Sequence, residues 1–231
     1  LRKEANTNLI TNILISDLSK PTYFIQNKKF KSLIDENNNG YFYLGTGFDK
    51  EINKIQMNDG FYLFLDINKL KINNINTSNT FDYENNLRLI KLRINQLELL
   101  NNTFKNQEFE INLLPNEINT SFKGDNLNGT ARVDQSGFTK INIFDSELDL
   151  EKLSFKKNTY SFDESVVKLR LTGKNIKILN DVINNVDFYI LKNANNITFD
   201  NIFFTSKNIN IGPYQEKDKA YISFNNKVEI H

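Results

Sequence analysis

Apolar and polar residues alternate with a period of two in many short runs from about residue 40 onward. The run at 109–113 reads Phe, Glu, Ile, Asn, Leu, and similar runs occur at 118–122, 167–171 and 186–190. Because successive side chains of a β-strand point to opposite faces of the sheet, this pattern predicts strands with one apolar face. The chain has only 9 Gly and 3 Pro, so Asn and Asp are expected to form most turns. The sequence therefore predicts a mainly β chain.

The N-terminal segment departs from this alternation. Its apolar residues follow the three-and-four spacing of one helix face: Leu9, Ile10, Ile13, Leu14 and Leu18. This spacing predicts a short helix over residues 6–18. The consecutive apolar residues 13–15 are equally compatible with a buried strand, so the pattern leaves both interpretations open.

The second half of the chain repeats short blocks of the first half in the same order. The paired blocks are 65–72 with 148–155, 91–94 with 168–171, 97–101 with 176–180 after a two-residue insertion, and 109–111 with 188–190. A repeat that buries its apolar face only against its neighbours builds an elongated structure. The kept order therefore predicts two copies of one antiparallel meander, stacked edge to edge.

These blocks divide the chain into three parts. Residues 51–147 form the first expected β-repeat, and residues 148–231 form the second. Residues 1–50, which include the possible helix, have no assigned counterpart. The first residue is Leu rather than Met, and we expect the chain to be a piece of a longer protein.

Strands with one apolar face can be arranged in two ways. In a sandwich, two sheets cover each other's apolar faces. A sheet that curls without a second layer instead leaves its apolar face as an open trough. The 19 Phe and 9 Tyr are spread through the alternating runs in a way that suits both arrangements, so the pattern alone does not choose.

The residue types that carry catalysis or bind transition metals are nearly absent. The chain has no Cys, and its one histidine, His231, is the last residue. This excludes a thiolate zinc site, a Cys nucleophile and a His-based triad within the chain. It also contains no phosphate-binding loop and no dinucleotide fingerprint. We expect no enzyme activity, no cofactor and no metal site.

Four alternating carboxylates are the one arrangement that suggests a cation site. They are Asp145, Glu147, Asp149 and Glu151, which share one face of a regular strand and are of the type that binds Ca²⁺. Neighbours on one strand face lie roughly 7 Å apart, which is too far for two of them to share an ion. The pattern therefore favours the solvated face of an amphipathic strand.

The charges of the chain are balanced. Its 29 Lys and Arg nearly cancel its 28 Asp and Glu, and both signs are mixed along the sequence. This argues against nucleic acid as a partner and against a polybasic membrane patch. No run approaches the roughly 20 apolar residues of a membrane-spanning helix.

Five segments, at residues 59–70, 89–99, 108–113, 123–131 and 140–153, follow one another in an order that resembles the AsmA-like proteins of Gram-negative envelopes. Residues 59–70 resemble a glycine-aromatic strand that runs into a Leu-Asp pair in that family, with Leu70 where the family typically has Trp. The resemblance covers roughly residues 55–231. Its further segments are strands of the type seen at 89–99 and 108–113, a connection like 123–131 and a closing strand like 140–153.

The resemblance implies a repeated β-groove protein that is anchored in the inner membrane and crosses the periplasm. Its curled sheet would present an apolar trough to phospholipid acyl chains and conduct phospholipids between the inner and outer membranes. The two membranes would be reached through parts of the parent protein outside this chain. The family has no catalytic residues to carry over.

Under this hypothesis the expected lining consists of the apolar residues in the repeated blocks. They are Leu92, Ile94, Leu97, Leu99, Phe109, Ile111, Leu169, Leu171, Ile176, Ile178, Phe188 and Ile190. The alternative is a structural or adhesive β-sandwich module of a surface protein, with a closed core. A carbohydrate-binding module would require an exposed row of aromatic residues, which the alternation does not indicate.

Overall fold

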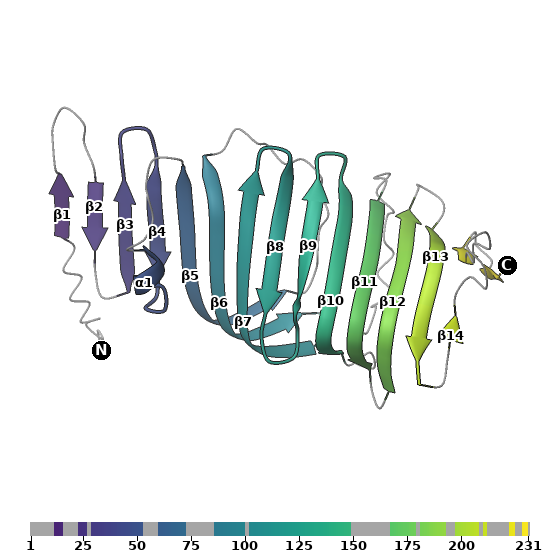
Figure 1. Ribbon diagram of the computed structural model, residues 1–231. Coiled ribbons are helices and arrows are strands. Elements are labelled where there is room, and N and C mark those ends of the chain that lie inside the picture. The colour runs from purple at the N-terminus through teal and green to yellow at the C-terminus, as the bar shows by residue number, and fades with distance from the viewer. Residues whose placement is uncertain are drawn as a thin grey trace, which may run out of the picture. The chain divides into compact units, whose positions relative to one another are not determined.

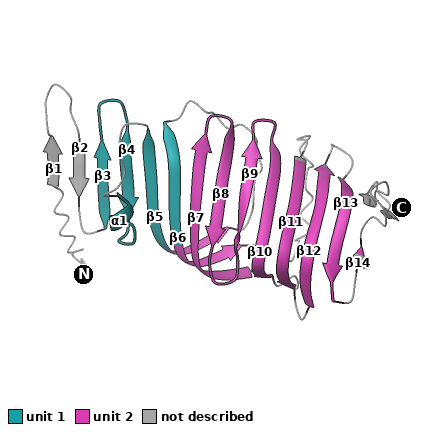
Figure 2. Cartoon of the chain, in the orientation of Figure 1, with its two compact units in different colours: residues 1–67, 82–93 teal, residues 68–81, 94–231 magenta. Residues whose placement is uncertain are grey.

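The computed structural model describes residues 12–15, 23–26, 29–52, 60–72, 86–99, 102–148, 167–178, 181–192, 197–207, 210–211, 222–224 and 228–230. The chain divides into two compact units, coloured differently in Figure 2. Unit 1 comprises residues 1–67 and 82–93, and unit 2 comprises residues 68–81 and 94–231. Each unit is described by itself.

Unit 1 is a sheet with one short helix. Its elements are β1 (Asn12–Ile15), β2 (Tyr23–Gln26), β3 (Phe30–Ile34), β4 (Gly40–Leu44), α1 (Asp49–Ile52) and the first parts of β5 (Phe61–Ile72) and β6 (Leu87–Leu99). The strands β1, β2, β3 and β4 pair antiparallel in sequence order. β4 then pairs parallel with β5, and the connection between them contains α1.

The structure corrects the expected N-terminal helix. Residues 12–15 form β1, which pairs antiparallel with β2, so the strand alternative is right for this stretch. The rest of the expected helix lies outside the described residues. Three consecutive apolar residues (13–15) satisfy a strand as well as a helix, and the paired neighbour β2 decides between them.

Unit 2 is a longer sheet. Its strands are the last parts of β5 and β6, then β7 (Asn102–Leu114), β8 (Glu117–Lys123), β9 (Gly129–Asp134), β10 (Phe138–Leu148), β11 (Val167–Ile178), β12 (Asp181–Lys192), β13 (Ile197–Ser206), β14 (Asn210–Ile211), β15 (Ile222–Phe224) and β16 (Val228–Ile230). From β7 to β13 each strand pairs with the next (Figure 1). β13 also pairs with β14 and β15, and β15 pairs with β16.

The mainly β fold is confirmed, with one correction to its topology. Most neighbours run antiparallel, as expected for meanders, but β4 with β5 and β10 with β11 run parallel. A parallel pair needs a crossover of a dozen or more residues. The chain supplies these in the connections 45–60 and 149–166. Alternation within a strand carries no information on the direction of its neighbour, so the sequence pattern missed these two pairings.

The sheet of unit 2 is curled, and a series of left-handed residues marks the bend. Asn106, Asp145, Asn175 and Asn201 all have φ between 46° and 54° and interrupt β7, β10, β11 and β13. Asp145 and Asn175 lie side by side, because Phe144 pairs with Lys174 and Ser146 with Ile176. Such interruptions bend a strand and increase its twist. The lower part of β7 in Figure 1 turns away from its upper part accordingly.

Three of the repeated sequence blocks fall on matching strands. Residues 91–94 and 97–99 lie in β6 and their counterparts 168–171 and 176–178 in β11, while 109–111 lie in β7 and 188–190 in β12. Each pair of long strands is joined by a short connection, at 100–101 and 179–180. The insertion in the second copy contains Asn175, one of the residues at the bend. The block at 149–155 lies outside the described residues, and the boundaries of the two repeats stay a prediction.

Candidate functional site

One face of the unit 2 sheet carries apolar side chains from β7 to β13. Paired residues of neighbouring strands point to the same side, so the register defines rows across the sheet. One row consists of Leu113, Ile118, Val133, Thr139, Leu169, Ile190 and Phe199. The next consists of Ile111, Thr120, Ala131, Ile141, Leu171 and Phe188, and a third of Phe109, Phe122, Gly129, Ile143, Gly173, Val186 and Phe204. We call these three rows, together with Ile176, Ile178 and Ile183 beyond the bend, the apolar face.

Most side chains of the apolar face are only partly buried. Ile111, Leu171 and Ile190 are examples, since they are neither buried nor fully exposed. Their sides contact neighbours within the sheet, but in the part of the chain that the structure describes no second sheet lies over them. A row of apolar side chains in this state is a surface rather than a core.

The opposite face of the same strands is polar, and we call it the polar face. It carries Glu110, Asn112, Asn119, Ser121, Thr130, Arg132, Lys140, Asn142, Lys168, Arg170, Thr172 and Lys174 among others. The two faces therefore differ in chemistry over most of each strand from β7 to β11, although Leu114, Phe138 and Phe144 also lie on the polar face. This is the arrangement expected of a sheet with water on one side.

Arg170 anchors an ion pair on the polar face. Its Nε and Nη2 donate to the two carboxylate oxygens of Asp187 at 3.0 and 2.7 Å, and its guanidinium lies 5.1 Å from the centre of the Tyr189 ring. The hydrogen bond to Asp187 is the main cause that raises the pKa of Arg170. The stacked rings of Phe138 and Tyr189 add a contact 6.5 Å between centres.

The bend buries part of the apolar face. Ile176, Ile183 and Val186 are only 3%, 7% and 9% exposed and form a cluster. Glu147 on β10 and Lys177 on β11, whose side chains point to the other side of the sheet, are exposed and pair with each other at 3.0 Å. The apolar face therefore lies on the inner side of the bend, where curvature brings side chains together.

Backbone turns and side-chain hydrogen bonds hold the corner of the bend. The side-chain Nδ2 of Asn128 donates to the backbone carbonyl of Asp145 at 3.0 Å. The side-chain Oδ1 of Asn128 accepts from the Gly124 N–H at 3.1 Å. Ser146 Oγ accepts from the Asn128 N–H at 2.9 Å. Gln107 is fully buried here, and its Oε1 has no hydrogen-bond partner in the described part of the chain.

Aromatic pairs occur at matching places on the apolar face. Phe109 and Phe122 lie 6.0 Å apart on β7 and β8, and Phe188 and Phe199 lie 6.1 Å apart on β12 and β13. Phe109 and Phe188 begin the same repeated sequence block. The repeat in sequence thus corresponds to a repeat in the chemistry of the face.

The structure brings most of the expected lining residues together. Phe109, Ile111, Leu169, Leu171, Ile176, Ile178, Phe188 and Ile190 all lie on the apolar face. Leu99 is partly buried in the unit 2 part of β6, and Leu92 belongs to unit 1. Binding of lipid at these residues stays a prediction.

Three of these residues are not where an open lining would place them. Ile94 and Leu97 are 1% exposed and Ile176 is 3% exposed, so they are packed against protein. Alternation identifies the apolar side of a strand, but it does not show where the sheet bends and closes over that side. We therefore leave these three out of the proposed contact surface.

Sequence reasoning also missed members of the apolar face. Ile141 and Ile143 on β10, and Phe199 and Phe204 on β13, share its rows with the expected residues. They lie outside the repeated blocks, which were the basis of the expectation. The alternation at residues 139–143 contained the signal that would have found the two on β10.

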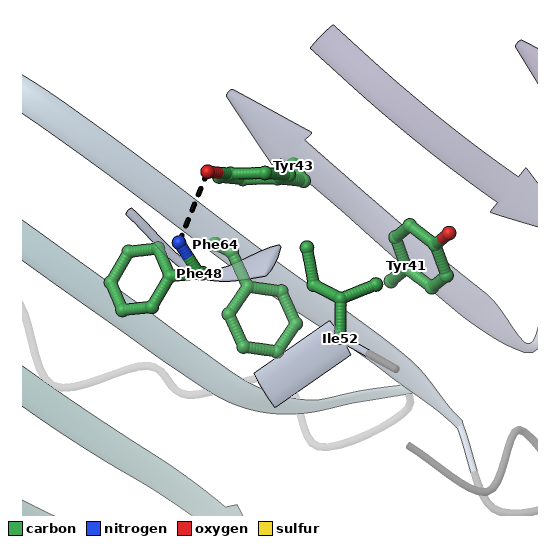
Figure 3. Close-up of a cluster of buried hydrophobic side chains, with 5 residues drawn as sticks. All are labelled: Tyr41, Tyr43, Phe48, Ile52 and Phe64. Atoms are coloured by element: carbon green, nitrogen blue, oxygen red, sulfur yellow. Dashed lines mark hydrogen bonds between the residues drawn. The ribbon is translucent and has the colours of Figure 1, made fainter. Parts of the chain in front are cut away.

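Unit 1 differs because a short segment covers one face of its sheet. Tyr41, Tyr43 and Phe64 point to the side where Phe48 and Ile52, from the segment with α1, lie against them (Figure 3). All five are buried, with exposed fractions of 9% or less. Phe48 contacts both Tyr43 and Phe64, with ring centres 6.1 and 5.6 Å apart.

Polar contacts fix this covering segment. The Phe48 N–H donates to the Tyr43 hydroxyl at 3.0 Å, and burial raises the pKa of that hydroxyl. Arg93 Nη1 donates to the Gly47 carbonyl at 2.7 Å, and its guanidinium lies 4.6 Å from the centre of the Phe48 ring. Lys31 on β3 forms an ion pair with Asp49 of α1.

The other face of the unit 1 sheet is also apolar. Phe30 and Phe42 contact each other there, with ring centres 4.9 Å apart. Register and alternation place Leu44, Leu63 and Leu65 on the same side. Leu44 is 42% exposed.

Leu92 shares this uncovered side of unit 1. Leu89 and Arg93 of β6 contact the cluster beneath α1. Because side chains alternate along a strand, Leu92 points to the opposite face from these two residues. Its side chain is partly buried. The expected lining residue in unit 1 thus lies on the face that the α1 segment does not cover.

The carboxylates considered for a cation do not form a regular row. Asp145 is left-handed and accepts from Asn175 Nδ2 at 3.0 Å, while Glu147 pairs with Lys177. Asp149, Glu151 and His231 lie outside the described residues. Within the described ranges, no group of three or more His, Cys, Asp or Glu side chains is placed to hold a metal ion.

Comparison with known proteins adds no relative. A scan against protein-family models and searches of curated proteins and of solved structures found no match to this chain. Among the described residues, no helix has the length and apolar character needed to cross a membrane.

Proposed function

We propose that the apolar face binds phospholipid acyl chains and forms a segment of a conduit that carries phospholipids between two membranes. The parent protein would be anchored in the inner membrane of a Gram-negative bacterium and cross its periplasm. The role is binding and guidance, without a chemical reaction. The resemblance to AsmA-like envelope proteins supports the setting, and the apolar face supports the ligand.

The observation that carries this proposal is an apolar surface that continues over seven neighbouring strands, β7 to β13, without a covering layer in the described residues. Strands lie about 4.8 Å apart, so the face extends roughly 30 Å across the strands. One leaflet of a bilayer contributes about half of a hydrocarbon core of ~30 Å. An acyl chain can therefore lie entirely on this face.

The energetics of lipid transfer explain why such a surface needs no specific contacts. A phospholipid with two chains has about 30 methylene groups, each worth roughly 0.8 kcal/mol when transferred out of water. Free passage through water therefore meets a barrier on the order of 20 kcal/mol. A surface that covers the chains and leaves the headgroup hydrated removes most of that barrier. Any mixture of Leu, Ile, Val and Phe serves this purpose.

Native mass spectrometry with lipid extraction tests the proposal. The full chain is purified from a Gram-negative host, and co-purified phospholipid is identified in the intact protein. We expect bound phospholipid in the unaltered chain and its loss in the variant Ile111→Arg with Ile190→Arg. Both residues are partly buried on the apolar face, so the charged side chains extend into the proposed lipid path.

The neighbouring residues supply a matched control. Asn112 and Leu191 follow Ile111 and Ile190 in sequence but point to the polar face, and Leu191 is 37% exposed. The variant Asn112→Arg with Leu191→Arg carries the same added charge on the same strands. We expect it to retain phospholipid. A lipid-free, cooperatively folded monomer in the unaltered chain would contradict the proposal and favour a structural or adhesive role.

A further inference from the structure

The polar face of unit 2 contains a hollow of about 490 Å³. Its side-chain lining comes from five neighbouring strands, β7 to β11, and the main contributors are Asn119, Ser121, Thr130, Arg132, Lys140 and Asn142. Thr120 and Ala131 also border it, but their side chains belong to the apolar face, so they contribute backbone to its floor. This hollow lies on the side of the sheet opposite to the proposed lipid surface.

The charge of the lining is positive. Arg132 and Lys140 are paired in the register of β9 and β10, so the two cations are neighbours. Among the described residues, no carboxylate belongs to the lining of the hollow. Glu117, next to it on β8, pairs with Arg132 and accepts from Asn119 Nδ2 at 2.6 Å. Glu117 thus balances Arg132. A second carboxylate, Glu110, lies opposite Ser121 and accepts from Asn112 Nδ2 at 3.4 Å, and no carboxylate pairs with Lys140 among the described residues.

Several hydrogen-bond donors of the hollow have no protein acceptor. Lys140, Ser121 and Thr130 form no side-chain hydrogen bond or ion pair with any part of the chain that the structure describes. Asn142 Oδ1 accepts from Thr172 Oγ1 at 3.1 Å, which leaves the Asn142 amide N–H groups for another acceptor. Paired strands place these donors side by side: Ser121 opposite Thr130, and Thr130 opposite Asn142.

We propose that this hollow binds the phosphate group of a phosphate ester, with Lys140 and Arg132 as the cations and Ser121, Thr130 and Asn142 as donors. A phosphate oxyanion accepts several hydrogen bonds at once and gains most from charged donors. The volume lies within the range of small-molecule sites, about 300–1,000 Å³. The hollow therefore accommodates a phosphate together with a short polyol. The site is independent of the apolar face and does not require lipid transfer.

Isothermal titration calorimetry of the full chain at low ionic strength tests this site, with glycerol 3-phosphate as the probe and glycerol as its uncharged counterpart. We expect glycerol 3-phosphate to bind and glycerol to give no signal. The variant Lys140→Gln with Arg132→Gln should weaken binding at least tenfold, since it removes both charged donors to the phosphate. Both residues are exposed, so the fold is retained.

Lys174→Gln is the matched control. Lys174 lies on the polar face of β11, is exposed and does not line the hollow. We expect its affinity for glycerol 3-phosphate to equal that of the unaltered chain. An equal loss in Lys174→Gln would show that only general positive charge is sensed and would overturn the site.

The phosphate can come from a soluble ester or from a lipid headgroup, and a second titration distinguishes the two sources. It uses vesicles that contain phosphatidylglycerol, with Ile111→Arg to separate headgroup binding from the apolar face. Binding in either titration that depends on Lys140 and Arg132 bears out the proposal and names the source. Binding that is absent in both, or that persists in the double variant, overturns it.

Discussion

The covered face of unit 1 and the apolar face of unit 2 are built from the same kinds of side chain but end in different states. In unit 1, Tyr43 and Phe64 are each 1% exposed because Phe48 and Ile52 lie over them. In unit 2, residues such as Ile111 and Leu171 stay partly exposed because no described segment lies over them. Composition does not separate the two regions. The difference in exposure comes from one segment of eight residues, 45–52, which lies between β4 and β5 and covers the sheet face in unit 1.

This difference shows that the open state of unit 2 is not forced by its strands. A short connection that supplies two apolar side chains, Phe48 and Ile52 at either end of a charged helix turn, is enough to close a sheet face in unit 1. The connections between β7, β8, β9 and β10 are instead short turns of mostly polar residues, at 115–116, 124–128 and 135–137, in which Leu127 is the one buried apolar side chain. They leave the apolar face accessible, and the proposed role of that face as a binding surface depends on this.

Phe64→Ala is expected to give the largest effect. Its ring is 1% exposed and contacts Phe48, so truncation leaves a cavity beneath the α1 segment. We expect a loss of about 3–5 kcal/mol in the free energy of unfolding, measured by urea denaturation with circular dichroism. The matched variant in unit 2, Ile111→Ala, removes only contacts with neighbours within the sheet. It should lower the free energy of unfolding by about 1–2 kcal/mol. Equal losses would mean that both faces are core and would break the comparison.

Tyr43→Phe sharpens the account of how unit 1 is closed. The change removes the hydroxyl that accepts the buried Phe48 N–H at 3.0 Å and leaves that donor without its partner. We expect a loss of about 1–3 kcal/mol in the free energy of unfolding and faster amide exchange at residues 48–52. Exchange that stays unchanged there would show that the aromatic contacts alone hold the segment.

Substitution of Asn175 tests the bend that shapes the apolar face. Asn175 has φ of 54°, a conformation that a β-branched residue adopts only with strain. Asn175→Val should lower the free energy of unfolding by about 1–2 kcal/mol, whereas Asn175→Gly should change it by less than roughly 0.5 kcal/mol. Similar losses in both variants would assign the effect to the side-chain hydrogen bond with Asp145 instead.

The smallest expected effect concerns Asp134, in the turn between β9 and β10 and away from both apolar regions. The Ser136 hydroxyl donates to its carboxylate at 2.6 Å and, with the Ser136 and Phe138 N–H groups, lowers its pKa. A lowered pKa in the folded state stabilises the fold above the ordinary value of 3.8 and loses that contribution as pH falls through the folded pKa.

In Asp134→Asn, the urea midpoint should therefore fall less steeply between pH 5 and about pH 2 than in the unaltered chain. The variant should have a slightly lower midpoint near neutral pH. The same series of urea titrations measures both. An identical pH dependence in the two proteins would show that the turn contributes nothing through this carboxylate.

Much of the strand pattern and the choice of apolar side could be predicted from the sequence. Period-two alternation identified the strands at 109–113, 118–122 and 167–171, and the register confirms that Ile111 and Leu171 share one face. This succeeded because side-chain direction within a strand is a local property. The sequence blocks that repeat also marked the matching long strands β6 with β11 and β7 with β12.

The features that the sequence did not reveal depend on contacts between distant segments. The α1 segment covers one sheet face through Phe48, whose N–H and ring both contact Tyr43. The burial of Ile94 and Leu97 likewise follows from packing that alternation does not encode. Asp145 breaks the expected carboxylate row because it is left-handed at the bend, and Asp is one of the few residues that tolerate this conformation.

Thiol labelling tests the central claim most directly, because the chain has no cysteine of its own. Three single variants are compared by the rate of their reaction with a maleimide: Ile111→Cys on the apolar face, Asn112→Cys on the polar face, and Phe64→Cys under the α1 segment. We predict that in lipid-free protein the first two react quickly and the third slowly. Added phospholipid should then protect Ile111→Cys alone. Slow reaction of Ile111→Cys without lipid, at the rate of Phe64→Cys, would show that the apolar face is closed and would contradict the account.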